Sequence, residues 1–309
     1  YLDGKDTVGT PGGATADDAF TGIVLASGMN GVDNNFGELV PASITGYVYA
    51  DTNNNGLRDD GPTGIGGIAV TLTGTNDLGP YTATTTTHPD GSYSFGDLRP
   101  GTYTVTEGAT PGYLDGKDTL GSVGGTLGND VLSAITLGQG DDAIEYNFGE
   151  LLPSSLSGHV YYDSNDDGLR AGEAPIAGVP IALSGTDDLG NAVSLTTTTN
   201  ASGYYEFNGL RPGTYTVRET AQPSGYFDGS ETQDNLTRDG ASAPGTDSIA
   251  LPALAAGAHD DRNNFGELPP SKVSGFVYVD ANDNGVKDAG EPALAGAPIR
   301  LTGTNNLGQ

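Results

Sequence analysis

The sequence predicts tandem all-β sandwich domains of about seven strands each. Apolar and polar residues alternate over short segments, and turn-forming Gly, Pro and Asn residues separate these segments about every 8–12 residues. The same order of segments then recurs along the chain, and no segment shows a helical period. Since one side of each segment is apolar and the other is rich in Thr, Ser and Asp, we expect half-buried antiparallel strands.

Internal repeats set the predicted domain boundaries. The pentapeptide Asn-Phe-Gly-Glu-Leu at residues 35–39 returns at 147–151 and 264–268. A period of this length corresponds to a whole domain rather than to one turn of a solenoid. We therefore expect the C-terminal part of a repeat over residues 1–39, complete repeats over 42–151 and 154–268, and the N-terminal part of a repeat over 271–309. We therefore expect this chain to be part of a longer array of repeats, with any signal peptide or cell-surface anchor outside it.

The strands of one repeat follow from its alternation. In the second complete repeat the predicted strand segments are residues 156–162, 179–183, 193–199, 205–207, 215–217, 249–251 and 264–265. The third of these segments is rich in Thr, which favours strands. Residues 210–214, Leu-Arg-Pro-Gly-Thr, form a turn between two strands, because Pro presets its φ angle and Gly supplies the bend.

Short linkers join the repeats. Residues 39–43, 151–155 and 268–272 each contain Pro, and none is a Gly/Ser-rich tether. Pro-bearing links of this length restrict the hinge between domains. We therefore expect neighbouring repeats of the chain to stack on one another as a rod.

An oxygen-rich loop follows the first predicted strand of each repeat. Its three copies cover residues 51–60, 163–173 and 280–291, with Asp or Asn at the first, third and fifth positions and Gly at the sixth. This is the ligand spacing of an EF-hand calcium loop, in which the seventh residue supplies its carbonyl and the Gly permits a sharp turn. No helical pattern flanks the loops, so we expect them to be grafted between strands.

These Asx-Gly loops are the predicted Ca²⁺ sites. The predicted ligands are Asp51, Asn53, Asn55, Leu57 and Asp59 in the first copy, Asp163, Asn165, Asp167, Leu169 and Glu173 in the second, and Asp280, Asn282, Asn284, Val286, Asp288 and Glu291 in the third. The third set is the fullest, Glu173 is eleventh rather than twelfth, and the first copy has Pro62 in place of the closing Glu. The alternative is a set of plain turns, which Asn, Asp and Gly favour without any ion.

The net charge of −28 excludes several classes of partner. Lys and Arg number 12 against 40 Asp and Glu, so the chain repels phosphate backbones and anionic membranes, and we expect no nucleic-acid partner. The acids instead favour bound cations, which offset the self-repulsion of the compact state. The absence of Cys excludes disulfides and thiolate metal sites, and no apolar run is long enough to span a membrane.

Catalysis finds little support in the sequence. His88, His159 and His259 fall at non-equivalent places in the repeats, and none has an obvious Ser or Cys nucleophile beside it. Paired Asp residues recur in every repeat at loop positions, which favours cation binding over glycoside hydrolysis. We therefore expect a protein that is not an enzyme.

The motifs together resemble the SdrD B-like repeats of serine-aspartate-repeat surface proteins and other bacterial adhesins. The likeness rests on residues 157–163 with the loop that follows, on Gly-Tyr-Tyr-Glu-Phe at 203–207, on Arg-Pro-Gly-Thr-Tyr at 211–215 and on Tyr-Asn-Phe-Gly-Glu at 146–150. It implies immunoglobulin-like or prealbumin-like sandwiches, an extracellular location on a bacterial surface or in a secreted protein, and calcium-stiffened stalk modules. It also implies more than one calcium ion per module.

The resemblance also suggests acids for a further ion, and it has one departure. The additional acids are Asp166 and Asp283 within the loops and the pairs Asp187 and Asp188, Asp115 and Asp118, Asp141 and Asp142, and Asp260 and Asp261 outside them. Related modules carry a Lys–Asn isopeptide bond, but the first strands at residues 46–49, 158–161 and 275–278 contain no Lys. We therefore expect bound calcium, rather than an isopeptide bond, to cross-link and stabilise each sandwich.

The sequence thus favours a structural calcium-binding stalk or fibre segment of a secreted or surface-attached bacterial adhesin or filament. Its expected partners are the neighbouring repeats of the same chain and, through lateral self-association into a fibre, other copies of it. The alternative is an adhesive module that binds a host protein or a polysaccharide. An exposed aromatic cluster present in only one repeat would favour that alternative.

Overall fold

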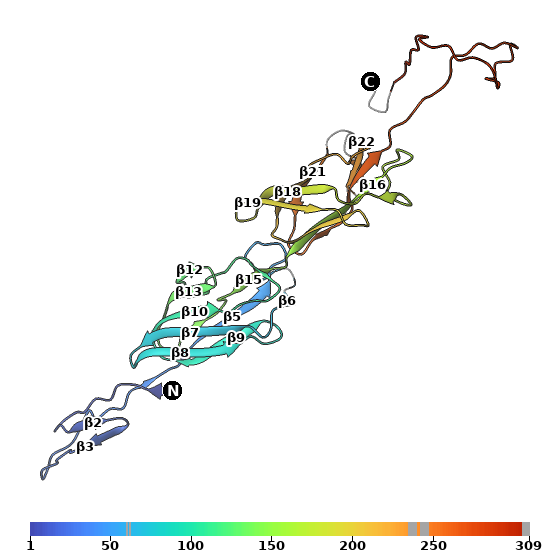
Figure 1. Ribbon diagram of the computed structural model, residues 1–309. Coiled ribbons are helices and arrows are strands. Elements are labelled where there is room, and N and C mark those ends of the chain that lie inside the picture. The colour runs from blue at the N-terminus through green and yellow to red at the C-terminus, as the bar shows by residue number, and fades with distance from the viewer. Residues whose placement is uncertain (60, 62, 234–239, 242–246, 305–309) are drawn as a thin grey trace. The chain divides into compact units, whose positions relative to one another are not determined.

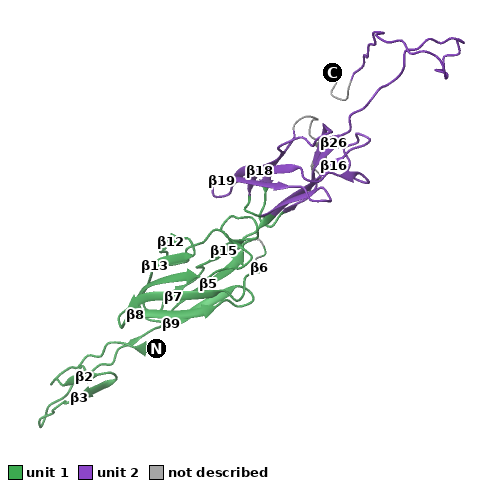
Figure 2. Cartoon of the chain, viewed as in Figure 1, with its two compact units in different colours: residues 1–154, 209–212, 254–258 green, residues 155–208, 213–253, 259–309 purple. Residues whose placement is uncertain are grey.

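Strands make up the regular secondary structure in the part of the chain that the structure describes. A computed structural model describes residues 1–59, 61, 63–233, 240–241 and 247–304 (Figure 1). Among these residues there is no helix that could cross a membrane. The chain separates into two compact units, the first comprising residues 1–154, 209–212 and 254–258 and the second the remainder (Figure 2). The predicted all-β class is confirmed.

The first complete sandwich consists of two sheets. One has the strand order β12 (Thr126–Gly128), β13 (Val131–Leu137), β10 (Gly101–Glu107), β7 (Ala69–Asn76) and β8 (Gly79–Thr86). The other has the order β11 (Leu114–Asp115), β15 (Phe148–Leu151), β5 (Ala42–Ala50) and β14 (Asp142–Ala143), and β6 (Thr63–Gly64) and β9 (Ser92–Leu98) also pair with β5. Seven of these strands have four or more residues, which agrees with the predicted number.

The second complete sandwich repeats this arrangement. Its first sheet has the order β19 (Ala192–Thr198), β18 (Pro180–Asp187), β21 (Gly213–Glu219) and β24 (Ser248–Leu254). Its second sheet has the order β17 (Ala174–Pro175), β16 (Ser154–Tyr162), β26 (Asn263–Leu268), β22 (Phe227–Gln233) and β23 (Gly240–Ala241), and β20 (Tyr204–Leu210) and β25 (His259–Asp260) also pair with β16. The two sandwiches therefore share one order of long strands, as the repeats in the sequence require.

The hydrophobic core of each sandwich follows from period-two alternation. In the first sandwich Ile44 of β5 belongs to one cluster with Leu72 of β7, Val105 of β10, and Leu132 and Ile135 of β13. All five side chains are 0% exposed. Because each strand contributes every second residue, short alternating segments are enough to build this core.

The first strand of each sandwich pairs with the last one in parallel. Val48 of β5 lies opposite Phe148 of β15, and Val160 of β16 lies opposite Phe265 of β26. These four side chains are at most 1% exposed. The prediction of antiparallel strands is wrong for this pair, because alternation records which face a residue occupies and not the direction of the neighbouring strand.

A glycine in the first strand lets the last segment of the repeat approach closely. A Cβ atom on Gly46 would lie 1.7 Å from Tyr146 O, and one on Gly158 would lie 1.7 Å from Asn263 O. The Tyr146 carbonyl also accepts a 2.6 Å hydrogen bond from the buried hydroxyl of Tyr93, and a tyrosine of β20 makes the same bond in the second sandwich. The glycine that opens each first-strand motif is therefore a packing requirement.

The segments that flank the sandwiches expose residues that complete sandwiches bury. In residues 1–39, β1 (Leu2–Asp3) pairs with β4 (Glu38–Leu39) and β2 (Ala14–Ala16) pairs with β3 (Ala19–Thr21). Phe36 is 50% exposed, whereas Phe148 at the equivalent position is 0% exposed. Phe276, in the copy of the first strand after residue 270, is 74% exposed. In both segments the described residues lack the partner strands that cover these positions in a complete sandwich.

We expect Gly46→Ala to destabilise the first sandwich by about 3 kcal/mol or more, because the methyl group overlaps a backbone carbonyl that is fixed by Tyr93. Gly96→Ala in β9 is the matched control, since a Cβ atom there meets nothing within 4 Å, and its effect should stay within about 0.5 kcal/mol. Denaturant unfolding of the chain measures both. Equal effects of the two substitutions would contradict the packing role of Gly46.

Candidate functional site

Each Asx-Gly loop is wrapped around the carboxylate of its first residue. In the loop at residues 163–173, Asp163 is 0% exposed and accepts hydrogen bonds from the backbone N–H groups of Asp167 at 3.1 Å and Gly168 at 2.9 Å. Asp166 and Gly168 have φ angles of 57° and 72°. These left-handed conformations produce the sharp turn for which the sequence placed a Gly at the sixth position.

The other two loops have the same geometry. Asp51 is 1% exposed and accepts the N–H groups of Asn55 at 3.2 Å and Gly56 at 2.7 Å. Asp280 accepts those of the equivalent residues at 3.1 and 2.8 Å. Backbone donors, with the Gly285 N–H as the largest cause, lower the pKa of Asp280 below its usual range. The backbone of the third loop therefore stabilises the ionised form of its first carboxylate.

The closing glutamates reach back to the start of their loops. Glu173 accepts hydrogen bonds from the backbone N–H of Ser164 at 3.3 Å and from its hydroxyl at 3.1 Å. Glu291 accepts one from the backbone N–H of Ala281 at 2.9 Å. The second loop therefore closes with its glutamate although it is one residue shorter than the third.

The remaining predicted ligands also meet within each loop. Side-chain amides donate to acids from Asn55 to Asp59 at 3.3 Å, from Asn165 to Asp167 at 2.8 Å, and from Asn282 and Asn284 to Asp288 at 2.8 Å. Leu57, Leu169 and Val286 extend their side chains into solvent. Pro62 lies outside the described residues. Because plain Asx turns make the same hydrogen bonds, the binding of Ca²⁺ by these loops stays a prediction.

A second and more buried group of acids joins several strands of the first sandwich. It consists of Glu107 at the end of β10, Asp115 in β11, Asp118, Asp130 between β12 and β13, and Glu150 in β15. Carboxylate oxygens of Asp115, Asp118 and Asp130 lie within 4.8 Å of one another, and so do those of Glu107, Asp130 and Glu150. We call these five residues the carboxylate cluster of the first sandwich.

The carboxylate cluster has buried oxygens without hydrogen-bond donors. Asp118 accepts the backbone N–H of Asp130 at 2.9 Å, which fixes the two acids relative to each other. Glu107 and Glu150 are 7% and 1% exposed. Glu107 Oε1, Asp115 Oδ1 and Asp118 Oδ1 have no partner among the described residues. Since such atoms are expensive to bury, the cluster has both the charge and the free ligand atoms that a cation uses.

The second sandwich has an equivalent carboxylate cluster. Oxygens of Asp228, Glu231 and Asp247 lie within 4.8 Å of one another, and Asp247 N donates to Glu231 at 3.0 Å. Glu219 and Glu267 occupy the places of the two glutamates of the first sandwich, and each is 1% exposed. Both carboxylate oxygens of Glu219 lack a partner among the described residues. A matching group in residues 1–39 consists of Asp3, Asp6 and Asp18.

Burial of like charges raises the pKa values in both clusters. Burial, followed by the charge of Glu150, raises the pKa of Glu107 far above its usual range, and burial with the charge of Glu267 does the same for Glu219. Burial is also the largest cause that raises the pKa of Asp118 to about 7. The ionised forms of these three acids lose hydration on burial, and negative neighbours add to the cost. A divalent cation would supply a positive partner.

Sequence reasoning identified only part of the carboxylate cluster. It named Asp115 and Asp118 among the additional acids, and it did not single out the other three members. One signal was present in the alternation of β10, where the buried positions are Tyr103, Val105 and Glu107. An acid at an inward strand position that recurs in the next repeat marks a buried polar site.

The fold and these sites define tandem β-sandwich modules with repeated acidic centres. The family model of the SdrD B-like domain matches residues 42–144 and 154–267. The chain therefore belongs to the SdrD B-like domain family, as its motifs predicted. Membership in this family places it outside the cell, at the bacterial surface, which confirms the predicted location.

Curated relatives cover most of this chain. Serine-aspartate repeat-containing protein F of Staphylococcus epidermidis is 34% identical over 289 residues, which are 90% of this chain and 16% of the relative. Serine-aspartate repeat-containing protein D of Staphylococcus aureus strain Newman is 31% identical over 291 residues, which are 92% of this chain and 21% of the relative. The chain thus spans only 16% to 21% of the length of these relatives.

Pilins are among the solved structures with a distant likeness to this chain. A streptococcal ancillary pilin has a TM-score of 0.33 at 11% identity, and the match covers 77% of this chain and 65% of the pilin. The shaft pilin spaA of Lactobacillus rhamnosus GG has a TM-score of 0.30 at 14% identity, and the match covers 77% of this chain and 100% of the pilin. Scores of this size support no argument about the function of the chain.

The raised pKa values predict how the cation-free chain responds to pH. A carboxyl group whose pKa is raised on folding destabilises the folded state once the pH exceeds its unfolded pKa of about 4, and increasingly so up to its folded pKa. That folded pKa is about 7 for Asp118 and Glu150. We therefore expect the melting temperature in metal-free buffer to fall between about pH 5 and pH 8.

Differential scanning calorimetry in metal-free buffers at several pH values measures this fall. Excess Ca²⁺ should remove most of it, because the ion supplies the missing positive partner. A metal-free melting temperature that stays constant or rises over the same range would contradict the assignment of the buried charges.

Proposed function

We propose that this chain is a calcium-binding structural segment of a bacterial surface protein. Ca²⁺ fixes each sandwich at its carboxylate cluster and at its Asx-Gly loop. The observation that carries the proposal is the recurrence, in both complete sandwiches, of a cluster of five acids with buried oxygens that have no donor in the described part of the chain. Such a cluster is stable at neutral pH when a cation compensates its charge.

The chemistry of the ligands favours calcium over other metals. The Asx-Gly loops offer carboxylate, amide and carbonyl oxygens, the carboxylate clusters offer carboxylate oxygens, and the chain has no Cys. Hard divalent cations prefer oxygen ligands, and soft or borderline metals prefer thiolate and imidazole. Calcium accepts six to eight oxygens in irregular geometry, whereas magnesium requires a near-ideal octahedron. A cluster assembled from several strand ends fits the more tolerant ion.

The carboxylate cluster gives calcium a mechanical effect. A bound ion would join the end of β10, the segment from Asp115 to Asp118, the turn at Asp130 and β15 at one centre. At about 1 mM extracellular calcium, a site with an affinity of 10⁻⁴–10⁻³ M stabilises the folded state by about 0.4–1.4 kcal/mol. This is a sizeable share of the roughly 5–15 kcal/mol that separates folded from unfolded domains.

On the scale of the repeat array, the proposed role is a stalk or fibre segment of an adhesin or filament. Its function is mechanical rather than catalytic. The Pro-bearing linkers support stacking of neighbouring repeats as a rod, and lateral association with other copies is the proposed route to a fibre. An adhesive role for the same modules is the alternative that becomes preferable if calcium has no effect.

Glu219→Gln should have opposite effects with and without calcium. It removes a carboxyl group that is 1% exposed, lacks donors among the described residues and must take up a proton when the cation-free chain folds at neutral pH, so the melting temperature in chelator should rise by a few degrees. The neutral amide is a poorer calcium ligand, so the calcium affinity of this cluster should fall about tenfold or more. Thermal unfolding in millimolar calcium and in chelator, together with calorimetric titration, measures both effects.

Glu206→Gln is the matched control for this experiment. Glu206 lies on β20 with its side chain exposed, so the same loss of charge should leave both measurements unchanged. Magnesium at the same concentration tests the choice of ion. If calcium leaves the melting temperature of the unsubstituted chain unchanged, the proposed role of calcium is wrong. The alternative, an adhesive module that binds a ligand on its strand faces, would then be tested next.

A further inference from the structure

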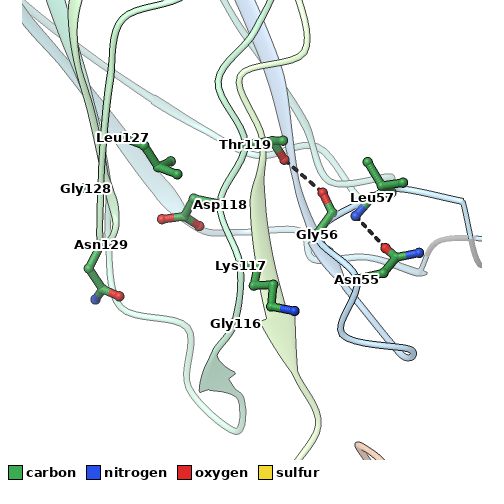
Figure 3. A pocket seen from close by; sticks show the side chains of 10 residues that line it. All are labelled: Asn55, Gly56, Leu57, Gly116, Lys117, Asp118, Thr119, Leu127, Gly128 and Asn129. Atoms are coloured by element: carbon green, nitrogen blue, oxygen red, sulfur yellow. Dashed lines mark hydrogen bonds between the residues drawn. The ribbon is translucent and has the colours of Figure 1, made fainter. Parts of the chain in front are cut away.

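A lysine side chain supports the first Asx-Gly loop from outside the loop. Lys117 Nζ donates a 2.6 Å hydrogen bond to Asn54 O. Two residues further on, Thr119 Oγ1 donates a 3.1 Å bond to Gly56 O (Figure 3). A Cβ atom on Gly56 would lie 3.4 Å from Lys117 Cβ, so the aliphatic stem of the lysine also packs against the tip of the loop.

These contacts are made at the most constrained part of the loop. Asn54 and Gly56 have φ angles of 54° and 80°, in the left-handed region where the chain reverses its direction. A hydrogen bond from an ammonium group is roughly twice as strong as one between neutral groups. Lys117 therefore stabilises the turn that orients the predicted ligands of this loop.

We propose that Lys117 is a tethered cation for the first Asx-Gly loop, which keeps the loop at residues 51–59 folded without calcium. The loop at residues 163–173 has the neutral Ser230 in the place of this lysine and depends on a bound ion for its order. The statement about the second loop rests on the proposed calcium binding, and the statement about Lys117 does not.

The second sandwich provides the natural comparison. The register that pairs β11 with β15 and β22 with β26 aligns Ser230 with Lys117. A Cβ atom on Gly168 would lie 3.7 Å from Ser230 Cβ and 3.7 Å from Thr232 Cγ2, so the same segment lies against the same part of the loop. The difference is the side chain, because serine is neutral and too short to reach as a lysine does.

The charges of the two loops match this difference. Residues 51–60 contain three acids, Asp51, Asp59 and Asp60, and residues 163–173 contain four, Asp163, Asp166, Asp167 and Glu173. Each loop also contains one arginine, Arg58 in the first and Arg170 in the second. Three acids and one arginine give the first loop a net charge of −2, which the ammonium group of Lys117 reduces to −1. Four acids and one arginine give the second loop a net charge of −3, and Ser230 stands in the place of the lysine, so we expect this loop to attract a diffusible cation more strongly.

Amide hydrogen exchange of the whole chain, read by mass spectrometry at residues 55–57 and 167–169, tests the proposal. Four proteins are compared in chelator and in millimolar calcium: the unsubstituted chain, Lys117→Ser, Lys117→Met and Ser230→Lys. Lys117→Met keeps the aliphatic stem and removes the charge, so it separates packing from the ammonium bond. Exchange in β10 serves as the internal control for folding.

In chelator, we expect residues 55–57 of the unsubstituted chain to exchange slowly and residues 167–169 quickly. Lys117→Ser and Lys117→Met should each speed exchange at 55–57 by about tenfold, the equivalent of one charge-assisted hydrogen bond. Calcium should restore most of this protection. Ser230→Lys should slow exchange at 167–169 in chelator.

Unchanged exchange at residues 55–57 in both Lys117 variants in chelator would overturn the tethered-cation proposal. An effect of Lys117→Ser without one of Lys117→Met would also overturn it, because packing alone would then explain the contact. If calcium gives residues 167–169 of the unsubstituted chain no protection, the proposed calcium binding of that loop fails. The chelator measurements on Lys117 keep their meaning in that case.

Discussion

Mutual repulsion of buried carboxylates is the constraint on which the rest of this structure depends. Each complete sandwich gathers five acids at its carboxylate cluster, and the glutamates of both clusters are at most 7% exposed. Apolar burial between the sheets supplies the stability that lets the strand ends approach one another. The cluster lowers that stability at neutral pH unless the folded chain protonates these acids or binds a cation.

The packing of the first strand explains why the acids meet. A glycine in β5 allows the segment before β15 to approach, and the parallel pairing that follows fixes Glu150 beside Asp115 of β11. The same strand arrangement fixes Glu267 beside Asp228 in the second sandwich. Core geometry and cluster chemistry are therefore linked, and a defect in the strand contact would also displace ligand oxygens.

The two kinds of candidate site differ in how their charge is compensated. In the Asx-Gly loops the central carboxylate accepts backbone N–H groups from its own loop, so much of the loop shape is encoded locally. In the carboxylate clusters the acids come from separate strands and several oxygens have no donor among the described residues. The clusters therefore respond most strongly to a cation, and the loops respond according to what lies beside them, as Lys117 and Ser230 illustrate.

The sequence by itself determined the all-β class, the repeats, the family and the positions of the Asx-Gly loops, because alternation and turn chemistry act over a few neighbouring residues. Only the tertiary structure decided the parallel pairing of β5 with β15, the meeting of Glu107 with Asp130 and Glu150, and the contact of Lys117 with Asn54. These features join residues that are far apart in the chain, and the lysine contact spans 63 positions. Period-two patterning specifies which face a residue occupies, but neither the direction of a strand nor the identity of its neighbours.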